Sequence, residues 1–332
     1  MRKFIVALLG ILFGIIGGVL LFEIALQIIM GPNLNTVEVY DNYITKKRES
    51  NIVGIFSKGW WFQLGNKVHI NEQGFHSKNP YKKPLNNNSI AIIGDSLIES
   101  TLVESQKLFH PTLETKFKEN GINATVYSLG ISGAGLGDYT KYASYAKDKF
   151  GTTKFIIKIQ NGDILDDIAQ NPAHFFYKTE NDTVKLSYKK QKYKLGSIDI
   201  KFPRYIAINL GLTPTSIFEK FKVKIFGKSK KAQNTTKEHN LDAKSNLILS
   251  KFLDDITLLA ENKKENLLFL VNGKTNLSFI LQKLKERNLE YILIHPMIKS
   301  TDIFYNDAHW NAKAINKISN AIVSKMMSKT NK

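Results

Sequence analysis

The sequence predicts a three-layer α/β/α domain with a five-stranded parallel sheet, preceded by one transmembrane helix. Two observations lead to this prediction. Apolar, β-branched segments alternate with helical patterns over most of the chain, which is typical of a parallel sheet covered on both faces, and an uncharged apolar run stands near the N-terminus. With 332 residues, 43% of them hydrophobic, the chain can also bury a sizeable core.

The uncharged run extends from Phe4 to Phe22 and continues, after Glu23, from Ile24 to Met30. At about 1.5 Å per residue the first part alone is about 28 Å long, close to the hydrocarbon thickness of a bilayer. A cleaved signal peptide would have a shorter apolar core and a small-x-small cleavage site, and the residues after this run offer no good one. We therefore expect residues 1–30 to form an uncleaved membrane anchor.

The charges that flank the anchor indicate its orientation. Arg2 and Lys3 precede the apolar run, whereas Glu38 and Asp41 are the first charges after Glu23. Because basic residues favour the cytoplasmic side, we expect a single-pass protein with its N-terminus in the cytoplasm. Everything after about residue 31 would then be periplasmic or extracellular.

Residues 31–88 are expected to form a lead-in segment packed on the core. The stretch from Val68 to Phe75 alternates like a strand, with Gly74 near its end, and Pro80 and Pro84 then mark a loop. We interpret this part of the chain as a hairpin followed by a connection to the first core strand.

The main domain is predicted over residues 89–328. Its strands are expected at Ser89–Ile93, Ala124–Leu129, Lys154–Gln160, Leu267–Val271 and Tyr291–His295. Its helices are expected near 105–119, 136–149, 243–262, 276–288 and 311–327. Residues of about 172–242 break this rhythm with short alternating strands and a lysine-rich run, so we expect an insertion there, on or beside the face that carries the site.

The first strand leads into Gly94-Asp95-Ser96, which is followed by a helix-like stretch. A tight turn at this point exposes a serine hydroxyl at the carboxyl edge of a parallel sheet, where the active sites of such folds lie. A serine hydroxyl becomes a useful nucleophile once a neighbouring base can take its proton. The competing interpretation is an ordinary strand-to-helix turn in which Asp95 or Ser96 caps the helix.

An acid and a base for this serine stand near the end of the chain, in Asp307-Ala308-His309-Trp310-Asn311. The His309 imidazole would accept the Ser96 proton, and the Asp307 carboxylate would fix the ring tautomer. The competing interpretation is that Asp307 or Asn311 caps the following helix and His309 is a surface residue. The chain order of serine, aspartate and histidine favours the catalytic interpretation.

Donors for an oxyanion are expected at the ends of the next two strands. The glycine-rich stretch from Leu129 to Gly137 follows the second strand and lets backbone N–H groups approach a ligand. It lacks the lysine of a phosphate loop and the spacing of a dinucleotide fingerprint. Asn161, just after the third strand, could supply an amide donor, although a turn asparagine in Asn161-Gly162-Asp163 is nearly as good an interpretation.

Charge and composition narrow the ligand classes. A formal charge of +18, from 47 Lys and Arg against 29 Asp and Glu, favours contact with polyanions such as acidic glycans or anionic lipids. The basic residues are spread along the chain and form no nucleic-acid module, so we expect no nucleic acid as a partner. There is no cysteine, and the histidines show no ligand spacing, so we assign no metal and no cofactor. We interpret Asp163, Asp166 and Asp167 as a solvated loop or the start of a helix.

With these residues identified, the chain resembles the SGNH, or GDSL, hydrolase superfamily over about residues 68–328, excluding the insertion. Gly94-Asp95-Ser96 matches its first block, and Ile70 to Phe75 is similar to a stretch that precedes that block in anchored members. For the second block Gly133 fits best, with Gly130 as the alternative. Asp307-Ala308-His309-Trp310 is similar to the Asp-x-His-Trp variant of membrane-associated polysaccharide O-acetylation proteins.

The third block departs from the family, because Gly162 stands where the family has its asparagine and Asn161 lies one residue early. The resemblance implies a flavodoxin-like fold and a serine esterase that removes O-acyl, more narrowly O-acetyl, groups from a cell-envelope glycan. Ser96, His309 and Asp307 would form the triad, and the backbone of Ser96 and Gly133 with the Asn161 amide would bind the oxyanion.

Three alternatives remain open at this point, one of them a lipase or lysophospholipase that works at the membrane surface. The same triad could serve an O-acetyltransferase with a sugar hydroxyl as acceptor, and such an enzyme would need a polytopic membrane protein to deliver the acyl donor. The chain could also be a non-catalytic, polyanion-binding envelope protein that keeps the fold.

Overall fold

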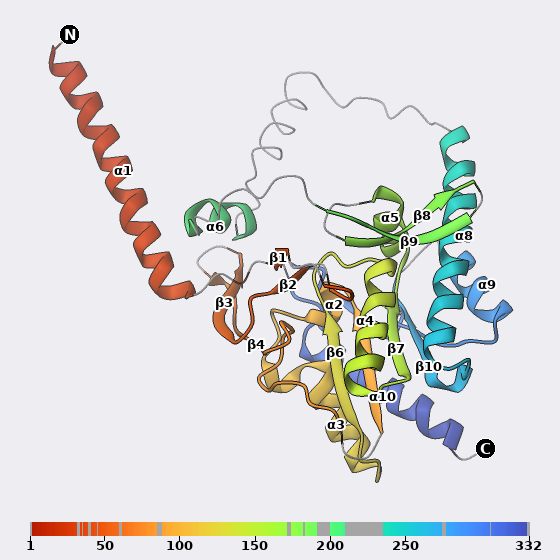
Figure 1. Cartoon of the computed structure of the whole chain (residues 1–332). Helices are drawn as coiled ribbons and strands as arrows, with labels where there is room; N and C mark the ends of the chain where they lie inside the picture. The colour runs from red at the N-terminus through yellow and green to blue at the C-terminus, as the bar shows by residue number, and fades with distance from the viewer. Residues whose placement is uncertain are drawn as a thin grey trace. The chain divides into compact units, whose positions relative to one another are not determined.

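The computed structural model describes residues 2–31, 34, 36–38, 41–44, 46–59, 62–84, 88–170, 174–181, 183–190, 200–209, 235–273, 277–305 and 307–330 (Figure 1). The chain divides into two compact units. Unit 1 comprises Met1–Leu34, Val53–Val68 and Lys194–Gln233, and unit 2 comprises Asn35–Ile52, His69–Tyr193 and Asn234–Lys332. The domain boundaries expected at about residues 30 and 88 stay predictions.

Unit 2 is built on a five-stranded sheet whose neighbouring strands all run parallel. Its order is β11-β10-β7-β5-β6, formed by Glu290–Leu293, Leu267–Val271, Lys154–Ile159, Ser89–Gly94 and Thr125–Gly130. Numbered along the chain, this order is 2-1-3-4-5, the flavodoxin-like arrangement. The parallel sheet predicted from the sequence is therefore confirmed, with strand ends that differ by one or two residues.

The strands alternate between two apolar cores, because successive side chains of a strand point to opposite faces. In β5, Ala91 and Ile93 belong to one core, whereas Ile90 and Ile92 belong to the other. Helices α4 (Leu136–Phe150), α8 (Thr235–Leu259) and α9 (Ser278–Glu286) contribute buried side chains to the first core. Helices α3 (Phe109–Glu119) and α10 (Ala312–Thr330) contribute to the second, so the predicted three layers are confirmed.

Two short helices of unit 2 follow strands of the sheet. The helix α2 (Ser96–Glu99) follows β5, which confirms the helix-like stretch expected after Gly94-Asp95-Ser96. The helix α5 (Asn161–Ala169) follows β7 after a single residue, where the sequence left a loop and a helix start as alternatives. The alternative of a turn at Asn161-Gly162-Asp163 is therefore wrong. Asp163 occupies the third position of α5 and accepts the N–H of Gln160, the residue that caps the helix, and Ile164 is buried in the core.

The segment predicted as an insertion begins with an antiparallel hairpin. Strands β8 (His174–Glu180) and β9 (Thr183–Lys189) pair with each other, and β8 lies against α4 and α5. Residues 191–199 and 210–234 lie outside the described part of the chain. The lead-in residues Phe75 and Tyr81 are buried in the first core of unit 2, beside Tyr127 and Phe150.

Unit 1 contains the N-terminal helix α1 (Arg2–Met30), the helix α6 (Lys201–Asn209) and most of the two-stranded sheet formed by β3 (Ile52–Lys58) and β4 (Leu64–Ile70). Among the residues that the structure describes, α1 is the helix that is long and apolar enough to cross a membrane. The short strands β1 (Thr36–Glu38) and β2 (Lys46–Arg48) pair within unit 2.

Candidate active site

The turn after β5 presents Ser96 at the carboxyl edge of the sheet. Gly94 has no room for a side chain, because a Cβ there would overlap Ile98 and approach the Cβ of Lys158 to 3.2 Å. The Asp95 carboxylate accepts the N–H of Leu97 at 3.0 Å and so caps α2. Asp95 therefore does act as a helix cap, and Ser96 remains as the first residue of the helix with its hydroxyl available.

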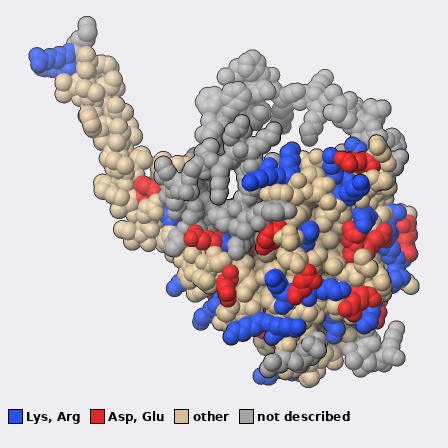
Figure 2. Space-filling view, viewed as in Figure 1, with Lys and Arg blue, Asp and Glu red and all other residues tan. Residues whose placement is uncertain are grey.

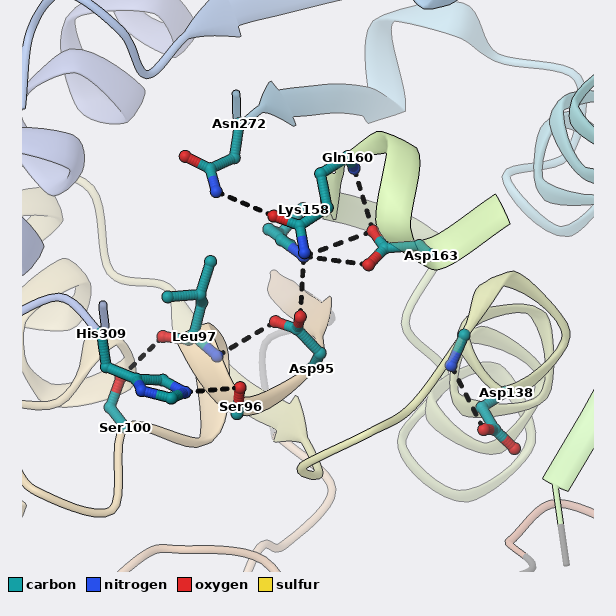
Figure 3. Close-up of polar contacts among 11 residues, drawn as sticks. Asp95, Ser96, Leu97, Ser100, Asp138, Lys158, Gln160, Asp163, Asn272 and His309 are labelled. Atoms are coloured by element: carbon teal, nitrogen blue, oxygen red, sulfur yellow. Dashed lines mark hydrogen bonds and ion pairs between the residues drawn. The ribbon is translucent and has the colours of Figure 1, made fainter. Parts of the chain in front are cut away.

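Ser96, His309 and Asp307 come together in one chain of hydrogen bonds. The Oγ of Ser96 lies 2.7 Å from Nε2 of His309, as Figure 3 shows. The other ring nitrogen of His309, Nδ1, contacts Oδ1 of Asp307. The Asp307 side chain is almost completely buried, whereas the imidazole is about one-third exposed. With the ring proton on Nδ1 and donated to Asp307, Nε2 is free to accept the proton of Ser96.

The loop that carries Asp307 and His309 is fixed at its end by Asn311. Its Oδ1 accepts the N–H groups of Lys313 and Ala314 at 2.9 and 3.3 Å, so Asn311 caps α10. The neighbouring Trp310 is buried and packs edge-on against Phe109 at 6.0 Å between ring centroids. The sequence left Asp307 and Asn311 as alternative caps of α10. The structure shows that Asn311 is the cap and that Asp307 contacts the imidazole of His309 instead.

A buried lysine lies beneath the nucleophile turn. Lys158 is 0% exposed, and its ammonium lies 2.8 Å from Oδ2 of Asp95 and 3.0 Å from Oδ1 of Asp163. Of the β7 residues that face the second core, Lys158 is the last along the strand, and it lies next to Gly94 of β5. A lysine is almost never fully buried without a charged partner. Lys158, Asp95 and Asp163 therefore form a buried network of ion pairs, which fixes Asp95 in the turn that carries Ser96.

The acidic cluster after β7 lies in helix α5, so the interpretation as the start of a helix is confirmed and the solvated loop is wrong; Asp166 is exposed, whereas its two neighbours in the cluster are buried. Asp163 and Asp167 are each 1% exposed, and Asp167 accepts the N–H groups of Gly137 and Tyr177. Burial raises the pKa of Asp163 to about 7, although the Lys158 ammonium acts in the opposite direction. Burial also raises the pKa of Asp167 well above its ordinary value.

The glycine-rich loop after β6 lies beside the serine turn. Gly130 has no room for a side chain, since a Cβ there would overlap the backbone of Ile98 and Glu99. Gly133 has a positive φ of 78° and open space around its Cβ position. Gly130 therefore serves the close approach of β6 and α2, which leaves Gly133 as the better candidate for an exposed donor.

A second buried ion pair holds this loop in place. The Glu99 carboxylate contacts Arg48, and its Oε2 accepts the N–H of Ser132 at 3.0 Å. Burial alone would raise the pKa of Glu99, but Arg48 and the donors of Ser132 outweigh it and lower the pKa. The residue before Gly133 is thereby tied to the end of α2.

Polar side chains also follow the two strands beyond β5. Asn161 is the first residue of α5, directly after β7 and Gln160. Asn272 follows β10, and its Nδ2 donates to Oε1 of Gln160 at 2.9 Å (Figure 3). Gly133 and Asn161 follow β6 and β7, the two strands that pair with β5, so both lie at the same edge of the sheet as Ser96, whereas Asn272 follows β10, one strand farther away.

The sequence did not reveal the importance of Lys158, Arg48, Glu99 and the Gln160–Asn272 pair. One signal for Lys158 was present, a single charge inside the apolar run Phe155–Ile159. Nothing in the spacing of Arg48 and Glu99 indicates that they meet. Among the residues that the structure describes, no group of histidine and acidic side chains is arranged to hold a metal ion.

The chain matches no protein-family model and no curated protein. It is similar to the solved structure of the psychrotrophic esterase EstA from Pseudoalteromonas sp., with 12% identity, a TM-score of 0.38, and coverage of 74% of this chain and 100% of the other. A lipase/acylhydrolase from Enterococcus faecalis shares 9% identity with a TM-score of 0.39, over 73% of this chain and 96% of the other. A member of the lipolytic protein G-D-S-L family from Veillonella parvula shares 9% identity with a TM-score of 0.36, over 71% of this chain and 96% of the other.

Proposed function

We propose that this chain is an SGNH-type serine esterase that removes O-acyl groups, and more narrowly O-acetyl groups, from a glycan of the cell envelope. The observation that carries the esterase proposal is the 2.7 Å contact between Oγ of Ser96 and Nε2 of His309, whose other ring nitrogen meets the buried Asp307. This geometry is what a serine needs to become a nucleophile at neutral pH.

In the proposed reaction the Ser96 Oγ attacks the ester carbonyl carbon while its proton passes to Nε2 of His309. Asp307 stabilises the imidazolium that forms. The carbonyl oxygen becomes an oxyanion and is bound by the N–H groups of Ser96 and Gly133, with the amide of Asn161 as a third donor. Collapse of this intermediate gives the alcohol, which takes the proton from His309, and an acyl-enzyme on Ser96. Water, activated by His309, then releases the carboxylic acid.

The glycan and envelope parts of the proposal have their own support. The Asp-x-His-Trp pattern resembles that of polysaccharide O-acetylation proteins, and the net charge of +18 suits an acidic polymer. Basic and acidic side chains are interspersed on the face shown in Figure 2, so the surplus charge is spread and forms no single stripe there. The apolar side chains of α1 are exposed from Phe4 to Leu21, as expected of a membrane anchor, and Arg2 and Lys3 favour a cytoplasmic N-terminus.

A second candidate function is O-acetyl transfer to a sugar hydroxyl by the same triad. It is favoured by Gly162, which stands where the family resemblance places an asparagine donor. Losing one oxyanion donor costs about 10²–10³ in rate, so hydrolysis by water could be slow while a bound sugar acceptor reacts. The transferase would require a polytopic membrane partner that supplies the acyl donor.

The test uses the full chain purified in detergent, with Ser96→Ala and Ser100→Ala as the variant and its matched control. Ser100 lies on the same turn, and its hydroxyl donates to the carbonyl of Leu97 instead of facing His309 (Figure 3). We expect hydrolysis of p-nitrophenyl acetate and labelling by a fluorophosphonate in the wild type and in Ser100→Ala, and neither in Ser96→Ala.

The outcomes separate the candidates. Labelling with negligible hydrolysis would favour the transferase if the unlabelled enzyme moves the acetyl group of p-nitrophenyl acetate to a hydroxyl of an added oligosaccharide and releases p-nitrophenol. If the folded wild type is neither labelled nor active, the catalytic proposal fails and a non-catalytic, polyanion-binding protein becomes the better interpretation. A higher rate with acetylated oligosaccharides than with p-nitrophenyl acetate would support the glycan as substrate.

A further inference from the structure

Helices α1 and α6 of unit 1 cap each other. The Glu23 carboxylate on α1 accepts the N–H of Lys201 at 3.0 Å and of Phe202 at 2.6 Å, so it caps the N-terminus of α6. In return, the Lys201 ammonium contacts the carbonyl of Gly31, directly after the last residue of α1. An anion at one helix N-terminus and a cation at the other helix C-terminus both interact favourably with the helix dipoles. We call these contacts the Glu23–Lys201 latch.

Apolar packing places α6 at the same level along α1. Leu26 and Met30 of α1 are buried together with Tyr205 of α6. The ring of Phe22 meets those of Phe202 and Tyr205 edge-on, at 5.9 and 5.5 Å between centroids. The contact surface on α1 thus begins at Phe22, directly before Glu23, and continues to the end of the helix.

The earlier part of α1 has no such cover in the described structure. Its large apolar side chains are exposed from Phe4 to Leu21. Residues 4–22 of a helix span about 28 Å, close to the thickness of the hydrocarbon core of a bilayer. Glu23 and the residues after it would then lie in the headgroup region, about 5–8 Å thick on each side.

We propose that α6 lies in the lipid headgroup region and that the Glu23–Lys201 latch sets its depth. This inference rests on the proposed membrane anchor. The surface of α6 that does not pack against α1 would face the lipid interface, where amphipathic helices bury their apolar face to a depth of about 5–10 Å. The segment that the sequence suggested as an insertion thereby returns to the membrane at Lys201–Asn209.

The residues around the latch favour lipid as the partner of α6. Ile200, directly before the helix, is 51% exposed, and Phe202 and Ile206 are half-buried. Phe62 adds an aromatic ring 5.4 Å from that of Tyr205. Aromatic rings gather at the boundary between hydrocarbon and water. A carboxylate at that boundary is costly unless it is paired, and α6 supplies two N–H donors to Glu23.

The absence of cysteine makes a depth measurement direct. Single cysteines at Ile200, at Leu12 in the middle of α1 and at Lys118 on α3 would carry an environment-sensitive fluorophore on the full chain in phosphatidylglycerol–phosphatidylcholine vesicles. Quenching by lipids that are brominated at different depths reports the position of each probe. We expect deep quenching at residue 12, shallow quenching at residue 200 and aqueous behaviour at residue 118.

The outcomes distinguish this inference from the anchor on which it depends. Deep quenching at residue 12 with a fully aqueous probe at residue 200 would overturn the interfacial position of α6 and leave the anchor intact. An aqueous probe at residue 12 would overturn both. Such a result would leave the esterase test unaffected, because that test is made in detergent.

The latch is tested separately with Glu23→Leu, which removes both acceptors and suits an apolar helix. We expect the residue 200 probe to lose its shallow quenching while the residue 12 probe stays deep. Gln27→Leu is the matched control, since it makes the same end of α1 more apolar and removes only the hydrogen bond that Gln27 donates to Oε1 of Glu23, while both contacts between Glu23 and α6 stay. Unchanged quenching at residue 200 in Glu23→Leu would overturn the role of the latch.

Discussion

The ammonium of Lys158 lies 2.8 Å from the carboxylate of Asp95, the residue directly before the proposed nucleophile. The other oxygen of that carboxylate accepts the N–H of Leu97. A buried cation on β7 is therefore connected, through one aspartate, to the turn that orients both the hydroxyl and the N–H of Ser96. This connection makes Lys158 a positioning residue in the proposed reaction.

Lys158→Met is expected to destabilise the protein and to lower the rate of ester hydrolysis. Removing one partner of a buried ionic element typically costs about 3–5 kcal/mol, because the remaining charges are left without compensation. The matched control is Lys154→Met at the start of the same strand, where the ammonium is half-buried and donates to Asn88. Urea unfolding in detergent and kcat for p-nitrophenyl acetate measure the two effects.

A second variant separates positioning from stability. Lys158→Met with Asp163→Asn removes one buried carboxylate together with the lysine, so we expect much of the stability to return. The rate should stay low, since Asp95 still lacks its cation. Full recovery of kcat in this double variant would contradict the positioning role.

Asp307→Asn is expected to lower kcat by about 10⁴ with little change in KM, because an amide no longer favours the ring proton on Nδ1 of His309. Asp302→Asn is the matched control. Asp302 is another buried aspartate of the same loop, but it contacts Lys317 and the N–H of Lys299. Steady-state kinetics give kcat and KM for both variants. An equal loss of kcat in Asp302→Asn would show that the effect of Asp307→Asn comes from the fold of the loop alone.

The sequence predicted the layers and the order of elements well, and for a physical reason. A strand that is buried on both faces must be apolar along its whole length, and the runs at Ile90–Ile93 and Leu267–Val271 satisfy this without interruption. The helix α5 was only one of the alternatives because Asn161-Gly162-Asp163 is typical of a turn. Its stability comes from the Gln160–Asp163 cap and from burial of Ile164, which local preference does not reveal.

The candidate site was predicted where sequence order carries information and missed where it does not. Ser96, Asp307 and His309 lie in two short motifs, and the structure brings them together. The partners of Glu99 and Lys158 were not predicted, since Arg48 and Asp95 lie 51 and 63 residues away from them. Buried ion pairs depend on three-dimensional proximity, which single-sequence patterns do not encode.

His76→Asn is expected to make the protein less sensitive to acid. Burial lowers the pKa of His76 from 6.5 to about 4, and its Nδ1 faces the carbonyl of Glu99 at 3.0 Å. The unfolded chain therefore binds a proton at a higher pH than the folded one, and folding stability falls as the pH drops from 6.5 through 4. A shift of this size corresponds to about 3 kcal/mol.

Asparagine keeps a donor near the position of Nδ1 and does not titrate, so this loss should be absent in the variant. The free energy of unfolding, measured in urea at pH 7 and at pH 4, gives the comparison. Equal losses in the wild type and in His76→Asn between these two pH values would show that His76 is not the sensitive group.

Gly130→Ala and Gly133→Ala should differ sharply, although Gly130 ends β6 and Gly133 lies only three residues later. A Cβ at Gly130 would come within 2.8 Å of the carbonyl carbon of Ile98, and the backbone there cannot move without displacing α2 and Ser96. At Gly133 the Cβ would meet nothing within 4 Å, so the cost is that of a positive φ, about 1–2 kcal/mol. Gly133→Ala also keeps its N–H.

We therefore expect Gly130→Ala to lose fluorophosphonate labelling and Gly133→Ala to retain most of it, with thermal unfolding of both variants recorded beside the labelling. If Gly133→Ala were as inert as Ser96→Ala while remaining folded, the loop would need the full freedom of glycine for the reaction, and a fixed oxyanion donor at Gly133 would be the wrong description.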